Sequence, residues 1–193
     1  MKFPVTAFCA AAVFTSALAS APARAQASAD AFTGPRAEVS VGLDQLRFDL
    51  AEVGSAGRAK TSDLGYAAAV GYDVALNPSV VIGLEGGVSL SDNQFATATG
   101  YLRERRELTL AGRVGTPIGD NALLYGKVGY ANLQVRAEDL VGSEKRNLDG
   151  ILLAAGAEVK ITPSTYLKGE YRYTDYSGGY VGNNVMTGIG IRF

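Results

Sequence analysis

The side chains that could do chemistry in this chain are carboxylates, amines, guanidinium groups and phenols, because its 193 residues include no histidine and only one cysteine. Histidine is the usual general base near neutral pH and the commonest metal ligand. A Ser-His-Asp hydrolase, a Cys-His enzyme and a His-built zinc site are therefore excluded. The one cysteine, Cys9, lies in an N-terminal apolar stretch. We predict no metal, no cofactor and no thiol chemistry in the mature protein.

Charged residues are the remaining candidates. The 18 basic and 19 acidic side chains nearly cancel and are interspersed, a pattern that indicates no nucleic-acid partner. Some of them occupy alternate positions within otherwise apolar segments, facing away from the apolar side chains. These are Glu85, Arg113, Lys127, Glu158, Glu170 and Arg172. Three acids and three bases can form ion pairs, the state in which a protein interior tolerates charge.

Two further groups of charges lie outside these segments. The guanidinium groups of Arg103, Arg105 and Arg106 suit the binding of phosphate groups. The alternative, and the commoner case for such a run of charged residues, is that the side chains are solvated and keep a loop extended. Asp63 and Glu107 are expected near the loop rim of the protein. No paired-carboxylate motif distinguishes them from ordinary solvated acids. We therefore predict that the protein is not an enzyme.

The elements that must position these charges are strands. From Arg36 to Phe193 the hydrophobic period is two, which predicts eight strands. Short turns containing proline follow every second strand, whereas long polar loops are expected over residues 47–61, 91–105 and 134–147. The register is least certain in the fifth and sixth strands. Glu158 is placed on the inner face there, and a slip of one residue would turn every side chain over.

The composition of the two strand faces indicates which one is inside. One face carries Val, Leu and Ile, and the other carries Gly, Ala and Ser interleaved with charges. A soluble lipocalin-like barrel would bury the first face, but glycine on a solvated strand face weakens the strand without compensation. In a narrow barrel, small residues leave room for a few long charged ones. The pattern predicts an all-β fold, an eight-stranded antiparallel up-and-down transmembrane β-barrel.

Tyrosines on the apolar face predict the two edges of the membrane. Such barrels carry an apolar band about 25 Å tall between girdles of aromatic residues. Tyr66 and Tyr72 are six residues apart on one strand, which is roughly 20 Å along the chain. Tyr130, Tyr171 and Tyr173 fit the girdle on the loop side. A tyrosine that simply favours strands is the alternative at each position.

The N-terminus reads as an export signal. Lys2 supplies a positive start, residues 7–19 are apolar but too short to span a bilayer as a helix, and Ala23-Arg24-Ala25 offers a small-residue cleavage site. The expected organisation is a cleaved signal peptide at 1–25, a short N-terminal lead at 26–35 and the barrel at 36–193.

In three segments the chain resembles the outer-membrane β-barrel domain family of Gram-negative bacteria, and within it the small porin-like alphaproteobacterial proteins of OmpA/OmpX-type architecture. The segments are residues 124–130, 167–176 and 187–193. The resemblance implies an outer-membrane location. It also implies that Ile189, Ile191 and Phe193 form the C-terminal signal read by the barrel assembly machinery. Expected partners are outer-membrane lipid, lipopolysaccharide, that machinery and an extracellular partner at the three loops.

Two functions remain open for such a barrel. The first is a non-enzymatic structural or surface-interaction protein whose lumen is plugged by the paired charges. The second is a narrow porin-like channel for ions or small solutes. Wide aqueous porins have 16 to 18 strands, about twice the number expected here, which favours the plugged barrel. Eight-stranded lipid-hydrolysing enzymes that use serine with histidine are excluded by the composition.

Overall fold

The computed structural model describes residues 29–49, 58–91, 94–96, 100–139 and 142–193, with backbone only for residues 48–49, 58–61, 94–96, 100–105, 136–139 and 142–146. The predicted signal peptide at 1–25 lies outside the described residues. A 3-10 turn, η1 (Ala29–Phe32), precedes the strands. These are β1 (Gly34–Asp49), β2 (Arg58–Asn77), β3 (Val80–Ser91), β4 (Gln94–Ala96), β5 (Gly100–Ile118), β6 (Ala122–Asp139), β7 (Gly142–Lys160), β8 (Thr165–Tyr176) and β9 (Tyr180–Arg192).

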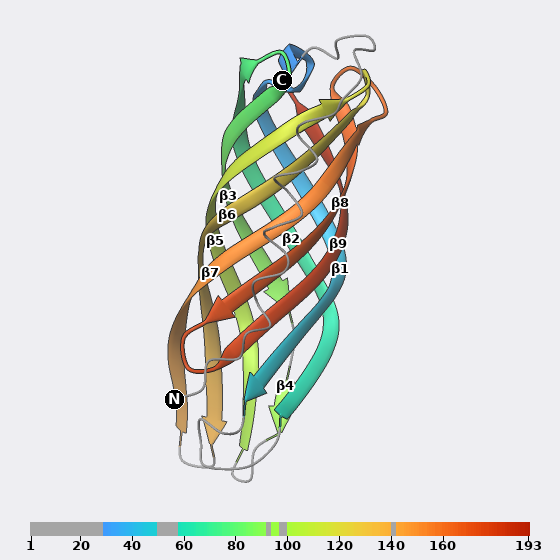
Figure 1. The fold of residues 1–193 in the computed structure, drawn as a ribbon. Coiled ribbons are helices and arrows are strands. Elements are labelled where there is room, and N and C mark those ends of the chain that lie inside the picture. Colours follow the sequence, from blue (N-terminus) through green and yellow to red (C-terminus); the bar gives the residue numbers. More distant parts are fainter. Residues whose placement is uncertain (1–28, 50–57, 92–93, 97–99, 140–141) are drawn as a thin grey trace.

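The strands close into one antiparallel barrel (Figure 1). Consecutive strands pair along the sheet, β1 pairs with β9, and both β3 and the short β4 pair with β5. β3 and β4 therefore act as one interrupted strand, and the barrel has eight. This confirms the predicted fold class. In the described part of the chain, no helix is long and apolar enough to cross a membrane.

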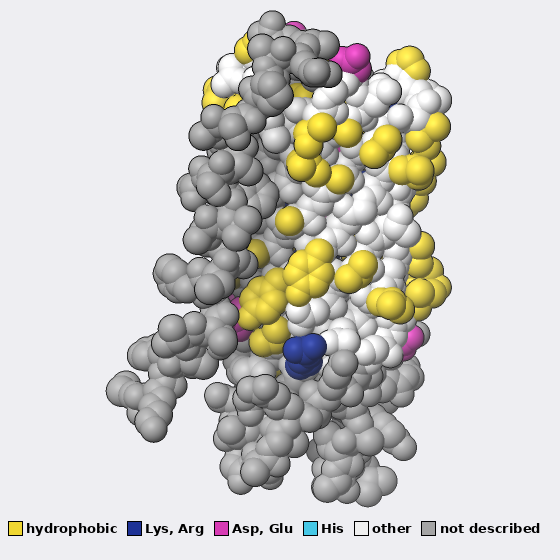
Figure 2. Space-filling view, turned by 45° about the vertical axis from the view of Figure 1, so that its right-hand side comes forward, with side chains coloured by type: hydrophobic (Ala, Val, Ile, Leu, Met, Phe, Trp, Pro, Cys, Tyr) yellow, Lys and Arg dark blue, Asp and Glu magenta, His cyan; other side chains and the backbone are white. Residues whose placement is uncertain are grey.

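The predicted strand phases are confirmed throughout, including those of the two ambiguous strands. Leu124 and Val128 are exposed on the outer surface, whereas Lys127 and Glu158 are buried in the lumen. The outer surface of the strands is dominated by exposed Val, Leu, Ile and Tyr, which appear as a yellow band in Figure 2. The barrel is thus inverted relative to a soluble protein, with charge inside and apolar side chains outside.

The described parts of the three predicted long loops are strand, which corrects their boundaries. β1 continues to Asp49 and β2 begins at Arg58, while β6 and β7 pair as far as Asp139 and Gly142. The prediction ended each strand where the apolar alternation ended. Backbone pairing continues beyond that point because polar side chains on both faces do not interrupt a hairpin ladder. The loop-side rim is therefore a wall of paired strands, and the long strands that form it are drawn in Figure 1.

Inward-facing glycines make room for tyrosine rings in the lumen. Gly156 lies opposite Tyr125 and Gly190 lies opposite Tyr166 in the strand register. A Cβ at Gly190 would approach the Tyr166 ring to 2.2 Å, and one at Gly156 would approach the Tyr125 hydroxyl to 2.5 Å. Each ring thus lies flat over the backbone of the neighbouring strand, an arrangement that compensates for the intrinsic weakness of glycine in a strand.

The N-terminal turn closes the turn-side mouth of the barrel. Phe32 and Ala29 of η1 are buried against Val81 and Leu123. The Lys160 ammonium lies 4.1 Å from the centre of the Phe32 ring, and the backbone N–H of Ala29 donates to the Pro78 carbonyl. The residues expected to be a short lead therefore contribute an apolar stopper.

We expect Phe32→Ala to loosen this stopper. Truncating a buried Phe to Ala typically destabilises a protein by about 3 kcal/mol or more. The variant barrel should unfold at lower urea concentration in vesicles, and its N-terminal residues should become accessible to protease. Phe193→Ala, at a residue that is 75% exposed, is the matched control. Equal urea midpoints and equal cleavage for both variants would contradict the role given to Phe32.

Candidate functional site: the charged lumen

The six charges expected in the lumen are all buried there and all make ion pairs. Lys127 Nζ bridges two carboxylates, lying 2.6 Å from Glu85 Oε1 and 2.6 Å from Glu170 Oε2. On the other side of Glu170, the Arg172 guanidinium lies 3.1 Å from Oε1. The Arg113 guanidinium lies 2.6 Å from Glu158 Oε1. These residues come from β3, β5, β6, β7 and β8, so the contacts cross the lumen.

Arg36 was not among the expected six, yet it pairs with three carboxylates of the network. Its guanidinium lies 3.0 Å from Glu38, 3.0 Å from Asp73 and 2.6 Å from Glu85, and its side chain has no exposed surface. Asp73 in turn lies 2.9 Å from Arg192. Because Arg36 is in the first strand and Arg192 in the last, the network also ties the two ends of the sheet together.

Among the described residues, seven acidic and six basic side chains are buried. The charges that sequence reasoning missed are Arg36, Glu38, Asp44, Asp73, Glu107, Lys168 and Arg192. All lie on the inward-facing side of their strands by the period-two count, so including every charge on that side would have revealed them. Lys168 pairs with Glu38, which also accepts a hydrogen bond from the Tyr166 hydroxyl.

The two acids expected at the rim differ in environment. Asp63 is exposed, as expected. Glu107 is only 3% exposed, which corrects its assignment as a solvated acid. Its carboxylate accepts a hydrogen bond from the Tyr176 hydroxyl and lies 3.7 Å from Arg172. Glu107 lies inside the barrel because it is an even number of residues from Arg113 on the same strand, and both side chains therefore point to the lumen.

Apolar clusters lie at both ends of the ionic layer. At the turn side the cluster is Ala29, Phe32, Val81 and Leu123. At the loop side it is larger, with Leu46, Ala111, Ala131, Leu133, Val135, Leu148, Leu152 and Tyr176. An ion crossing the barrel would leave water, pass an apolar layer and enter a region whose charges are already paired. Moving an ion into an apolar environment is very unfavourable.

The remaining candidate residues lie on the outer surface. Tyr66, Tyr72, Tyr130 and Tyr171 are exposed there, and Tyr173 is half-buried. The Tyr130 hydroxyl donates to Asp149 and the Tyr171 hydroxyl donates to Asn183 at 2.7 Å. Ile189, Ile191 and Phe193 are exposed in one row of the last strand. Arg106 is exposed beyond Leu108 on β5, whereas the side chains of Arg103 and Arg105 lie outside the described part.

The contacts of these charges are ion pairs and hydrogen bonds to other lumen residues. Within the described residues, no three His, Cys, Asp or Glu side chains gather in a way that could hold a metal ion. The buried carboxylates face arginine, lysine and tyrosine donors. These contacts suit a structural ion-pair network, in which each charge is compensated by its neighbours.

Known proteins with similar sequences are outer-membrane proteins. A 22 kDa outer membrane protein of Rhizobium leguminosarum bv. viciae is 30% identical over 126 residues, a match that spans 59% of this chain and 59% of that protein's own length. A 25 kDa outer-membrane immunogenic protein of Brucella ovis is 26% identical over 143 residues, covering 74% of this chain and 70% of the other. Their location agrees with the one expected for this chain.

Solved structures show the same fold at low sequence identity. Neisserial surface protein A superimposes with a TM-score of 0.63 at 11% identity, covering 83% of this chain and 98% of that one. Ail, the attachment invasion locus protein of Yersinia pestis, gives a TM-score of 0.57 at 19% identity, covering 83% and 99%. The family model described as outer membrane protein beta-barrel domain matches residues 9–193. With its closed, inverted barrel, this chain belongs to the outer membrane protein β-barrel family and is an outer-membrane protein.

Proposed function

We propose that this protein is a closed, non-enzymatic outer-membrane barrel with a structural or surface-interaction role, and that its lumen does not conduct. The observation that carries this proposal is the layered lumen. A network of buried ion pairs centred on Arg36 and Lys127 lies between two apolar clusters. Such a lumen is unfavourable to hydrate, and its buried acids and bases, seven and six among the described residues, nearly balance, so it does not favour one type of ion strongly. The lumen is therefore better suited to a rigid scaffold than to a conduction path for ions.

Recording in planar bilayers tests the closed lumen. We expect the purified, folded barrel to give no stable unitary current steps at ordinary salt concentration. Leu133→Ala combined with Leu148→Ala, which thins the buried loop-side cluster, should raise the leak only slightly because the ionic layer remains. Stable unitary steps in the wild-type protein that change size in Lys127→Ala would support the narrow porin-like channel instead.

The surface role rests on the part of the barrel beyond the apolar band. β5, β6 and β7 are 19, 18 and 19 residues long, compared with 12 for β8, so a paired wall rises at the loop side. The Yersinia relative is named for attachment and invasion, and the Brucella relative is called immunogenic. By analogy, we assign contact with an extracellular partner to this wall, within residues 47–61, 91–105 and 134–147.

Two further partners belong to the same proposal. Exposed Ile189, Ile191 and Phe193 form an apolar row on the last strand, which suits recognition by the barrel assembly machinery. Arg106, together with Arg103 and Arg105 on the same strand, suits contact with lipopolysaccharide phosphates above the membrane.

A further inference from the structure

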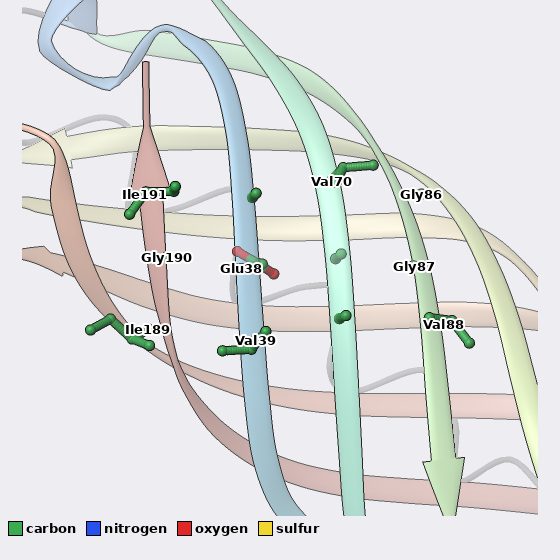
Figure 3. Close-up of a pocket in the computed structure, with 12 residues that line it drawn as sticks. Glu38, Val39, Val70, Gly86, Gly87, Val88, Ile189, Gly190 and Ile191 are labelled. Carbon is green, nitrogen blue, oxygen red and sulfur yellow. The ribbon is translucent and has the colours of Figure 1, made fainter.

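Two shallow apolar grooves on the outer surface differ in the charge near them, since among the described side chains a cation lies beyond the second groove and none lies beyond the first on β2 and β3. The first groove, of about 610 Å³, crosses β9, β1, β2 and β3 and is drawn in Figure 3. Ile191 and Val70 border one side of it, and Ile189, Val39 and Val88 border the other. The one charged residue in its lining, Glu38, is buried on the lumen side of β1. This groove offers a ligand apolar contacts only.

The second groove, of about 510 Å³, crosses β1, β9 and β8 nearer the loop side. Leu43, Val185 and Tyr171 lie side by side in the strand register and form its loop-side border. Its floor is formed at Thr187 and Gly169, which are also in register. A Cβ at Gly169 would meet nothing within 4 Å, so the hollow there is open and is not needed for packing of the barrel.

The polar atom of the floor is turned away from the groove. The Thr187 hydroxyl donates to the Lys168 carbonyl at 3.2 Å. The groove therefore presents apolar surface from β1 to β8. Because it lies within the apolar band of an outer-membrane protein, its occupant must be apolar where it touches the floor.

A cation lies beyond this groove, farther along β1 toward the loop side. Arg47 is exposed four residues beyond Leu43, about 13 Å along the strand and roughly 10 Å in height after tilt. That position is beyond Tyr171, in the polar headgroup layer rather than in the hydrocarbon.

The Arg47 guanidinium is oriented by an amide. Its Nε and one terminal nitrogen donate to the Gln45 side-chain oxygen at 3.1 and 2.7 Å, and Gln45 also donates to the Ser62 hydroxyl. Within the part of the barrel whose side chains are described, Arg47 forms no ion pair with a carboxylate. Its charge is thus held in place and remains available to an anion, and a guanidinium forms paired hydrogen bonds to phosphate.

We propose that the β1–β9–β8 groove and Arg47 together bind one phosphate-bearing lipid of the outer leaflet. An acyl chain lies over Thr187 and Gly169, beside Leu43 and Val185. The lipid phosphate accepts hydrogen bonds from Arg47. The apolar groove matches the acyl chain of a lipid, and Arg47 matches its phosphate. The groove lies deeper in the membrane than Arg47, as the acyl chain lies deeper than the phosphate. A purely apolar partner would not need the cation.

Lipid retention by the purified, folded barrel tests this site. The barrel in detergent is mixed with diphosphorylated lipid A, and bound lipid is counted by native mass spectrometry. Arg47→Ala should weaken binding roughly three- to tenfold, the effect of one basic residue at a membrane surface, and Arg47→Lys should recover part of it. Gly169→Leu, which fills the groove, should weaken binding by a similar factor. Lipid A without phosphates should bind the wild type no better than it binds Arg47→Ala.

Ala68→Leu is the matched control because it fills the first groove, whose lining residues, as far as the side chains are described, present no cation on the outer surface. It should leave retention unchanged, and a gel shift on boiling shows that each variant is folded. Equal loss in Ala68→Leu and Gly169→Leu would mean unspecific annular lipid and would overturn the proposal. So would a loss in Arg47→Ala alone, no loss in any variant, or a dimer of barrels that Gly169→Leu dissociates.

Discussion

Arg36→Met should destabilise the barrel by about 3–5 kcal/mol, the usual effect of removing one partner from a buried ion pair. The guanidinium has no exposed side-chain surface and contacts the carboxylates of Glu38, Asp73 and Glu85. Its removal leaves negative charges in a lumen with little water to solvate them. The measurement is the urea midpoint of unfolding in phosphatidylcholine vesicles, followed by the loss of the fast-migrating folded band on gels without boiling.

The control for Arg36 is Arg106→Met, which removes an exposed cation from the outer surface. Surface ion pairs contribute about 0–1 kcal/mol, so this variant should unfold close to the wild type. A second variant, Arg36→Met combined with Glu85→Gln, should recover part of the loss because it removes one unpaired charge. If the single and double variants unfold at the same urea concentration, the ion pairs do not stabilise the lumen.

Gly190→Leu should prevent folding of the barrel, whereas Gly126→Leu should be tolerated. Gly190 faces the lumen, where a Cβ alone would approach the Tyr166 ring to 2.2 Å, and a leucine adds three further carbons. The ring cannot retreat easily, because the Tyr166 hydroxyl donates to Glu38 at 2.9 Å and the Arg192 guanidinium lies 5.2 Å from the ring centre. Gly126 faces outward, and a Cβ there would meet only the Ala154 carbonyl, at 3.7 Å.

The measurement is the folded yield after dilution from urea into vesicles. We expect little or no heat-modifiable band from Gly190→Leu. Gly126→Leu should give a wild-type yield or a slightly higher one, since leucine is favourable on a lipid-facing strand. Restoring the yield with Gly190→Leu plus Tyr166→Ala would localise the defect to the ring. Similar yields from both glycine variants would show that the lumen is loosely packed.

The layered lumen explains why the buried charges of this chain are nearly balanced. In a narrow barrel each inward charge must find a partner across the lumen, so acids and bases have to occur in similar numbers. The buried set has seven acids and six bases. Apolar clusters at the two ends then separate this set from water, which strengthens each ion pair because electrostatic attraction is less screened away from solvent.

The sequence by itself determined the fold class, the strand phases and the location. A strand with one apolar and one polar face shows a hydrophobic period of two in its sequence, because the pleat of a strand sends neighbouring residues to opposite faces. Placing Glu158 in the lumen was enough to orient the nearly continuous apolar run around it, since a one-residue slip would have buried a charge in lipid. The composition of the two faces then separated a membrane barrel from a soluble one.

Three features were decided only by the tertiary structure. The contacts of Arg36 with Asp73 and Glu85 join three strands, and period-two reading places a residue on a face without showing its partner across the lumen. The stopper formed by Phe32 arises from a turn with no periodic signal. The extension of β6 and β7 to Asp139 and Gly142 depends on backbone hydrogen bonds, which side-chain polarity does not report. The sequence pattern determines to which face of a strand each side chain points. Closure of the barrel determines which side chains from distant strands come into contact.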